Sequence, residues 1–236
     1  PASRQRAAMP AQSRLTAACT SGQSYIGSDA IGAPLINDPR FAPAGVLAPK
    51  SKADLAFTLH ILSWLAVNGT AAIVEFPGVL YRGAAEQKIR QYLIDNNYVD
   101  AVIQLPPDLF FGTTIATCII ILKKSKHDNA TLFIDASAEF VRSGNKNKLL
   151  PEHQQKILAA FTGRQSMEHF ARLVENGDIA ANGYNIAVSS YVEQKDEREA
   201  VDIRVLNAKI SRIVERQAEL REQIDAIVAD LEGEQV

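Results

Sequence analysis

The sequence that decides the fold of this chain is Tyr98-Val-Asp-Ala-Val-Ile-Gln-Leu105, which is followed after a short loop by Ile115-Ala-Thr-Cys-Ile-Ile-Ile-Leu122. Both runs are apolar and rich in β-branched residues, as buried strands are. Pro106 and Pro107 end the first run. Because so short a loop leaves no room for a crossover helix, we predict that the two strands pair antiparallel.

Two more apolar runs lie on either side of this pair. Thr70-Ala-Ala-Ile-Val-Glu-Phe76 and Leu132-Phe-Ile-Asp135 also read as strands. Helices are predicted after Ser51, which has the capping-box spacing with Asp54, from about residue 84 to 96, and from Pro151. Short apolar strands separated by helices predict an α/β fold, with a mostly parallel sheet covered on both faces.

Composition narrows the class of protein further. The chain has 236 residues, 47% of them hydrophobic and 22% charged, and a formal net charge of −2. This length suffices for a sizeable core in one or two domains, and the charge excludes a nucleic-acid binder that works by a strongly basic net charge. Cys19 and Cys118 are the two cysteines, so we expect a reduced, cytoplasmic setting. No apolar run approaches the roughly 18 residues of a membrane span.

The N-terminal segment differs from the rest. Residues 1–35 begin with Pro1 rather than methionine, are rich in Ala, Ser and Arg, and contain no acidic residue before Asp29. A transit peptide has this composition, but we expect a disordered or cloning-derived segment, outside the fold. We expect the folded domain to cover residues 36–192, and residues 193–236 to form a charged linker and a helical arm.

The helical arm carries the clearest periodic pattern. Apolar residues recur three and four apart over roughly four heptads, with one polar residue at position 217. The positions are Ile203, Leu206, Ile210, Ile213, Gln217, Leu220, Ile224, Ile227 and Leu231. This seam predicts a coiled coil or a bundle helix that docks on a partner. The alternative is a long helix that folds back on its own domain.

Common catalytic motifs do not occur in the sequence. There is no Gly-x-Gly-x-x-Gly, no phosphate-binding Gly-x-x-x-x-Gly-Lys-[Ser/Thr] and no Gly-x-Ser-x-Gly. The four histidines, at positions 60, 127, 153 and 169, have no cysteine or acid at metal-ligand spacing. We therefore predict no metal site.

Two segments between the predicted elements are candidates for ligand contact. Phe110 and Phe111 lie in a Pro- and Gly-framed loop after a strand, where α/β sheets bind ligands and where aromatic rings can stack on a base. The alternative is that these rings only cover the edge of the sheet. Arg142, Lys146 and Lys148 lie in a Gly- and Asn-rich segment. They are candidate DNA-binding residues, and the alternative is a solvated loop.

Several blocks in order resemble one family. They are Asp38-Pro-Arg-Phe-Ala-Pro-Ala-Gly45, Gly78-Val-Leu-Tyr-Arg-Gly83, Leu105 to Gly112 with Thr117-Cys118, Phe133-Ile-Asp-Ala-Ser137 and Tyr184-Asn185. From about Asn37 to the C-terminus the chain resembles the C-terminal portion of the modification subunit of type I restriction–modification systems. The resemblance implies half of a Rossmann-like methyltransferase sheet.

The resemblance also implies an activity and partners. Such subunits are adenine-N6 DNA methyltransferases that use S-adenosylmethionine and act on an adenine flipped out of the duplex. They assemble with a specificity subunit and a restriction/translocase subunit. By this similarity Phe110 is the first candidate for stacking on the target base and Phe111 the second. The C-terminal helix corresponds to the arm that packs on the specificity subunit.

The sequence departs from the family in two places. The glycine-rich cofactor motif and the Asn-Pro-Pro-Phe catalytic motif do not occur, and Asp38-Pro39-Arg40-Phe41 matches a different family segment. We therefore assign no catalytic and no cofactor-binding residue, and expect the chain alone to be inactive. The alternative function is an interaction module that docks through its C-terminal helix. We also expect self-association through an exposed sheet edge.

Overall fold

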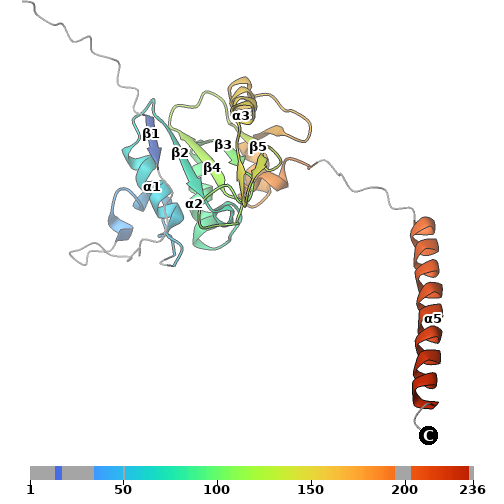
Figure 1. Ribbon diagram of the computed structural model, residues 1–236. Coiled ribbons are helices and arrows are strands. Elements are labelled where there is room, and N and C mark those ends of the chain that lie inside the picture. Colours follow the sequence, from blue (N-terminus) through green and yellow to red (C-terminus); the bar gives the residue numbers. More distant parts are fainter. Residues whose placement is uncertain (1–13, 18–34, 50, 195–202, 234–236) are drawn as a thin grey trace, which may run out of the picture. The chain divides into compact units, whose positions relative to one another are not determined.

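The computed structural model describes residues 14–17, 35–49, 51–194 and 203–233 (Figure 1). The chain divides into two units, residues 1–194 and 195–236, and each is considered by itself. The expectations of disorder for residues 1–13 and 18–34 and of a linker at 195–202 lie outside the described residues.

A six-stranded mixed sheet forms the centre of the first unit. In spatial order its strands are β1 (Arg14–Ala17), β2 (Thr70–Glu75), β4 (Cys118–Lys123), β3 (Val99–Gln104), β5 (Ala130–Asp135) and β8 (Ala171–Glu175). Strands β1, β2, β3 and β5 run parallel, whereas β4 and β8 run antiparallel to their neighbours. The predicted mixed α/β class and the antiparallel pairing of β3 with β4 are confirmed.

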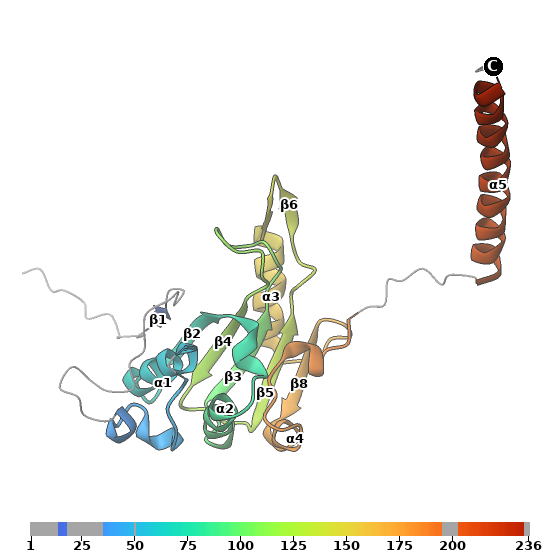
Figure 2. The same cartoon turned by 90° about the horizontal axis from the view of Figure 1, so that it is seen from below.

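Helices cover both faces of this sheet (Figure 2). Helices α1 (Asp54–Trp64), α2 (Ala85–Asp95) and α4 (Asn176–Ala181) lie on one face, and α3 (Pro151–Gly163) lies on the other. Two hydrophobic clusters result, one around Leu55 and Ile89 and one around Leu132 and Ala160. Short 3-10 turns connect the elements at Leu35–Asn37, Ala42–Ala44, Pro77–Leu80 and Val188–Ser190.

A small hairpin stands apart from the main sheet. Strands β6 (Val141–Ser143) and β7 (Lys146–Lys148) pair antiparallel with each other and with no strand of the six-stranded sheet. Gly144, with φ +60°, occupies the first position of the two-residue turn between them, where a positive φ suits the twist of the two strands. The segment expected to be a polar loop is therefore an ordered β-hairpin.

Four details differ from the sequence predictions. Strand β1 lies in the segment expected to be outside the fold, and it covers the edge of β2, so that β2 is not an open edge. The four residues of β1 are too few to give a periodic signal. Helix α1 begins after Ala53 without a side-chain cap, so the predicted capping box at Ser51 is wrong. Strand β4 begins at Cys118 rather than Ile115, and β8 with α4 was not predicted.

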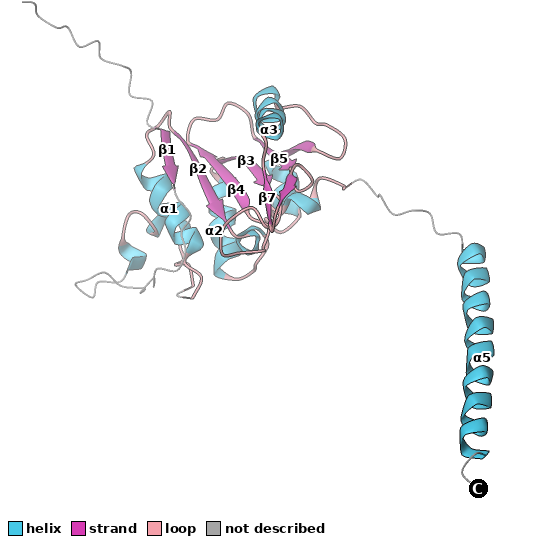
Figure 3. Ribbon diagram, in the orientation of Figure 1, coloured by secondary structure: helices cyan, strands magenta, loops and turns pink. Residues whose placement is uncertain are grey.

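The described residues of the second unit form one helix, α5 (Ile203–Gly233), shown in cyan in Figure 3. The predicted helix is confirmed, and its pairing with a partner stays a prediction. The described side chains of α5 are exposed, including the apolar seam. In the part of the chain that the structure describes, none of the helices is long and apolar enough to cross a membrane.

Candidate functional site

The aromatic loop, residues 105–117, connects β3 to β4 at one end of the sheet. Its neck is closed by a hydrogen bond from the Leu105 amide to the Thr117 carbonyl, 2.9 Å long, and by one from Gln104 Nε2 to the same carbonyl at 3.2 Å. Asp108 and Gly112 have positive φ values of 55° and 79°. The chain changes direction at these two residues, so the loop projects from the sheet instead of continuing either strand.

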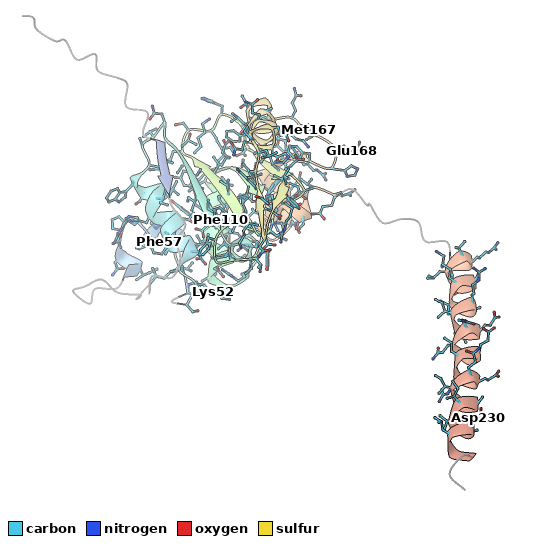
Figure 4. The ribbon with its side chains drawn as sticks, in the orientation of Figure 1. Lys52, Phe57, Phe110, Met167, Glu168 and Asp230 are labelled. Carbon is cyan, nitrogen blue, oxygen red and sulfur yellow. The ribbon has the colours of Figure 1, made fainter. Side chains whose placement is uncertain are left out.

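The two phenylalanines of the aromatic loop have different environments. Phe110 is half-buried and packs against the hydrophobic cluster beneath α3. Figure 4 labels it within the first unit. Phe111 is fully exposed. Phe110 therefore packs as expected from the alternative, in which the ring covers the sheet. Phe111 instead presents a free aromatic surface.

The β6–β7 hairpin is joined to the aromatic loop by Asn147. This side chain is only 6% exposed. Its Nδ2 donates to the Pro107 carbonyl at 2.8 Å, and its backbone amide donates to the Asp108 carbonyl at 3.0 Å. Its Oδ1 accepts a bond from Arg142 at 3.1 Å. Sequence reasoning missed Asn147, whose one signal is a neutral polar residue between two lysines.

Two of the three candidate DNA-binding residues also contact this loop. Arg142 Nη1 lies 3.1 Å from the Asp108 carboxylate, and Lys146 Nζ lies 3.9 Å from it. Lys146 also donates to the Thr113 carbonyl at 2.9 Å. Lys148 is exposed and has no polar side-chain partner among the described residues. The predicted basic and aromatic residues are thus brought together, and Asp108, which sequence reasoning did not select, offsets part of the positive charge.

A row of polar side chains crosses the sheet on the face covered by α1 and α2. Glu75, Cys118, Gln104 and Asp135 are paired in register on four neighbouring strands. Residues paired in this way point to the same face of a sheet. Three of the four lie at the carboxyl ends of parallel strands, which is where ligands bind in α/β folds.

The acidic members of this row already have partners within the chain. Burial, and then the nearby Asp54 charge, raise the pKa of Glu75 to about 7. Asp135 accepts bonds from the Ser137 amide at 2.9 Å and from Gln194 Nε2 at 3.1 Å. We assign none of the residues of this row to S-adenosylmethionine. No group of three or more metal-ligating side chains occurs among the described residues.

Helix α5 presents a second candidate surface. Its seam residues Leu206, Ile210, Ile213, Leu220, Ile224 and Ile227 have exposed fractions between 45% and 66%. Gln217 is the polar residue at the middle of the seam. Charge is unevenly distributed along the helix: the N-terminal half carries Arg204, Lys209, Arg212 and Arg216 with one acid, Glu215, and the C-terminal half carries Glu219, Glu222, Asp225, Asp230 and Glu232 with one base, Arg221.

Comparison with known proteins identifies the family. The family model described as N-6 DNA Methylase matches residues 23–200. The chain belongs to this family. The match begins inside residues 1–35, the segment expected from its composition to lie outside the fold.

The relatives of this N-6 DNA methylase family member include methylase subunits of type I systems. It is 49% identical over 198 residues to the type I restriction enzyme MpnII methylase subunit of Mycoplasma pneumoniae, covering 84% of this chain and 36% of that protein. A solved methyltransferase subunit of a type I restriction-modification system from Streptococcus thermophilus is 44% identical, with a TM-score of 0.67, over 68% of this chain and 34% of that one.

A more distant structure supports the fold. The type I restriction enzyme EcoKI M protein aligns with a TM-score of 0.53 at 18% identity, over 74% of this chain and 45% of that one. The sequence-based resemblance to type I modification subunits is confirmed. The chain spans about a third of the length of the two more similar relatives.

Proposed function

We propose that this chain forms part of the adenine-N6 DNA methyltransferase subunit of a cytoplasmic type I restriction–modification system. In this proposal it supplies one wall of the target-base pocket and the arm that docks on the specificity subunit. The restriction/translocase subunit joins the same complex. S-adenosylmethionine is the methyl donor in this proposal, and we assign no residue of this chain to hold it.

One observation carries the proposal for the base pocket. Phe111 presents a fully exposed ring at the tip of a loop beside the carboxyl ends of β2, β3 and β5. An exposed aromatic ring costs hydration free energy unless a partner covers it, and a flipped base is a partner of the right shape and chemistry. Phe110, the first candidate by family resemblance, packs against the hydrophobic cluster beneath α3 and is the other member of the proposed stacking pair.

The catalytic part of the proposal concerns the chain by itself. Because the sequence has no Asn-Pro-Pro-Phe motif, nothing in it is assigned to hold the adenine amine during transfer. We expect the purified 236-residue chain to transfer no methyl group from labelled S-adenosylmethionine to DNA. Methylation above the level of a no-enzyme control would overturn this part of the proposal.

The second candidate function is docking through α5. Its seam leaves apolar side chains uncovered over a 31-residue helix, and heptad seams of this kind pair with other helices. Deleting residues after Glu199 is expected to abolish binding to the specificity subunit and to leave the first unit folded, as circular dichroism would report. Binding that survives the deletion contradicts the docking role.

Contact with DNA and self-association complete the proposal. Arg142, Lys146 and Lys148 are proposed to meet the phosphate backbone, with Lys148 the least engaged by other groups. Phosphate contacts release counterions, so binding of duplex DNA should weaken as salt rises, and salt-independent or undetectable binding contradicts the contact.

Self-association through a sheet edge predicts dimers at high protein concentration, and a clean monomer in sedimentation contradicts it.

A further inference from the structure

The geometry points to a positioning role for the β6–β7 hairpin: we propose that Asn147, with Lys146, fixes the conformation of the aromatic loop so that Phe111 is held in place for the target base. The inference rests on the proposed function of Phe111. It adds an element, the hairpin, and a residue, Asn147, whose task is to act through the loop and not to touch the base.

The first argument is where the hairpin makes its contacts. The side-chain hydrogen bonds that Arg142, Lys146 and Asn147 make end either on the aromatic loop or within the hairpin. Strands of three residues cannot form a stable hairpin alone, and these two do not join the main sheet. The loop and the hairpin therefore stabilise each other.

The second argument is where these bonds fall on the loop. Asn147 binds the Pro107 and Asp108 carbonyls, on the N-terminal side of the phenylalanines, and Lys146 binds the Thr113 carbonyl on the C-terminal side. The backbone of Phe111 is thus held from both directions. Ordering a residue's backbone costs roughly 1–2 kcal/mol, so a loop that is ordered beforehand meets its ligand with less loss of entropy.

The third argument is the burial of Asn147. It is the one buried residue of the two hairpin strands. The side-chain amide binds the Pro107 carbonyl and the Arg142 guanidinium, and both lose this partner when the side chain is removed. The bond from the Asn147 backbone amide to the Asp108 carbonyl is retained. Asn147 is also uncharged, so its contribution, unlike that of Lys148, does not depend on attraction to phosphate.

The test compares Asn147→Ala with Lys148→Ala in the full chain. Both variants carry Trp64→Phe and Phe111→Trp, so that the new indole is the only tryptophan and reports on the loop. Time-resolved fluorescence anisotropy without DNA should show the amplitude of nanosecond indole motion rising about twofold in Asn147→Ala and staying unchanged in Lys148→Ala. Equal anisotropy in the parent and in Asn147→Ala overturns the inference, whatever the result with DNA.

A second variant covers the case in which Asn147→Ala unfolds the hairpin. Lys146→Gln removes the ammonium contact with the Thr113 carbonyl and leaves Asn147 in place. A smaller increase of the same motion is expected. Lack of any change in this variant, together with lost circular dichroism in Asn147→Ala, contradicts positioning and leaves only a structural role.

The DNA readout separates this inference from the proposed function. Quenching of the indole by an adenine-containing single strand should weaken in Asn147→Ala to the same degree at low and high salt, because no charge was removed. In Lys148→Ala the weakening should disappear at high salt. If the loop loosens in Asn147→Ala but DNA quenches no variant, the positioning role stands and the base-stacking function fails.

Discussion

The hydroxyl of Thr58 lies 3.3 Å from the Glu75 carboxylate, and this contact joins α1 to the end of β2. Both residues are buried, at 0% and 3% exposed. The Asp54 charge and burial both favour the protonated form of Glu75, whereas the Thr58 bond and Arg82 oppose it. The interface between the sheet and α1 thus favours the protonated, uncharged form of the Glu75 carboxyl group.

This pairing predicts a pH dependence of stability. The pKa of Glu75 is raised from 4.5 to about 7 on folding, so the folded state binds the proton more tightly than the unfolded state. Stability contributed by the protonated group is full below pH 4.5 and is lost as the pH rises toward 7. In urea unfolding, the free energy of unfolding of Glu75→Gln, measured relative to that of the parent, should rise by about 2–3 kcal/mol when the pH is raised from 5 to 7.5. Glu168→Gln, at an exposed position, is the control and should follow the parent at both pH values.

Arg90 predicts a large loss of stability on substitution. Its side chain is 1% exposed and donates to the Val79 carbonyl at 2.9 Å and to the Tyr184 carbonyl at 2.8 Å. Arg90→Met should lower the free energy of unfolding by about 2–4 kcal/mol, since one buried and one partly buried carbonyl lose their donor. Lys88→Met, on the exposed side of the same helix, should change it little. Equal denaturation midpoints for the two variants would contradict the role of Arg90.

Substitutions of Tyr191 can distinguish the contribution of its ring to stability from that of its hydroxyl. Its ring stacks on Phe133 with centroids 4.3 Å apart, and its hydroxyl donates to the Asn185 carbonyl. Tyr191→Phe keeps the stacking and should cost about 1 kcal/mol. Tyr191→Ala removes both and should cost about 3–5 kcal/mol. Thermal melts followed by circular dichroism measure the difference, and equal melting temperatures would show that the stacked ring contributes nothing.

Cys118 should be chemically inert in the folded chain. Its thiol is fully buried, and burial raises its pKa to about 12. In a Cys19→Ser background, Ellman's reagent should detect no thiol under native conditions and one per chain in denaturant, because the thiolate is the reactive form. Rapid reaction of the native protein would mean that this end of β4 opens readily.

The sequence predicted the strands whose burial does not depend on distant partners. The β-branched run that ends at Leu122 forms a strand in any buried sheet, and β3 and β5 are similarly apolar. Strand β8 escaped prediction because Arg172 and Glu175 interrupt its apolar character. Strand β1 depends on pairing with Thr70–Ile73, far along the chain, which local sequence does not encode.

The candidate site was predictable in its parts but not in its assembly. Phe110, Phe111 and the basic residues were found from their types and neighbours. The bond between Asn147 and Pro107 spans 40 positions, and a turn-forming Asp after two prolines does not by itself show that Asp108 adopts a positive φ. What joined the parts was the folding of a polar segment into a hairpin, which depends on the loop that it contacts.

The charges of α5 oppose its own peptide dipoles. Its first turn contains no acidic residue and its last turn no basic one, whereas aligned peptide groups favour the reverse at each end by about 0.3–1 kcal/mol. The isolated helix therefore gives up some stability to this charge order. The same charge order favours one orientation of a partner helix. A helix with this charge order that lies antiparallel along the seam places opposite charges together at both ends, whereas a parallel one places like charges together.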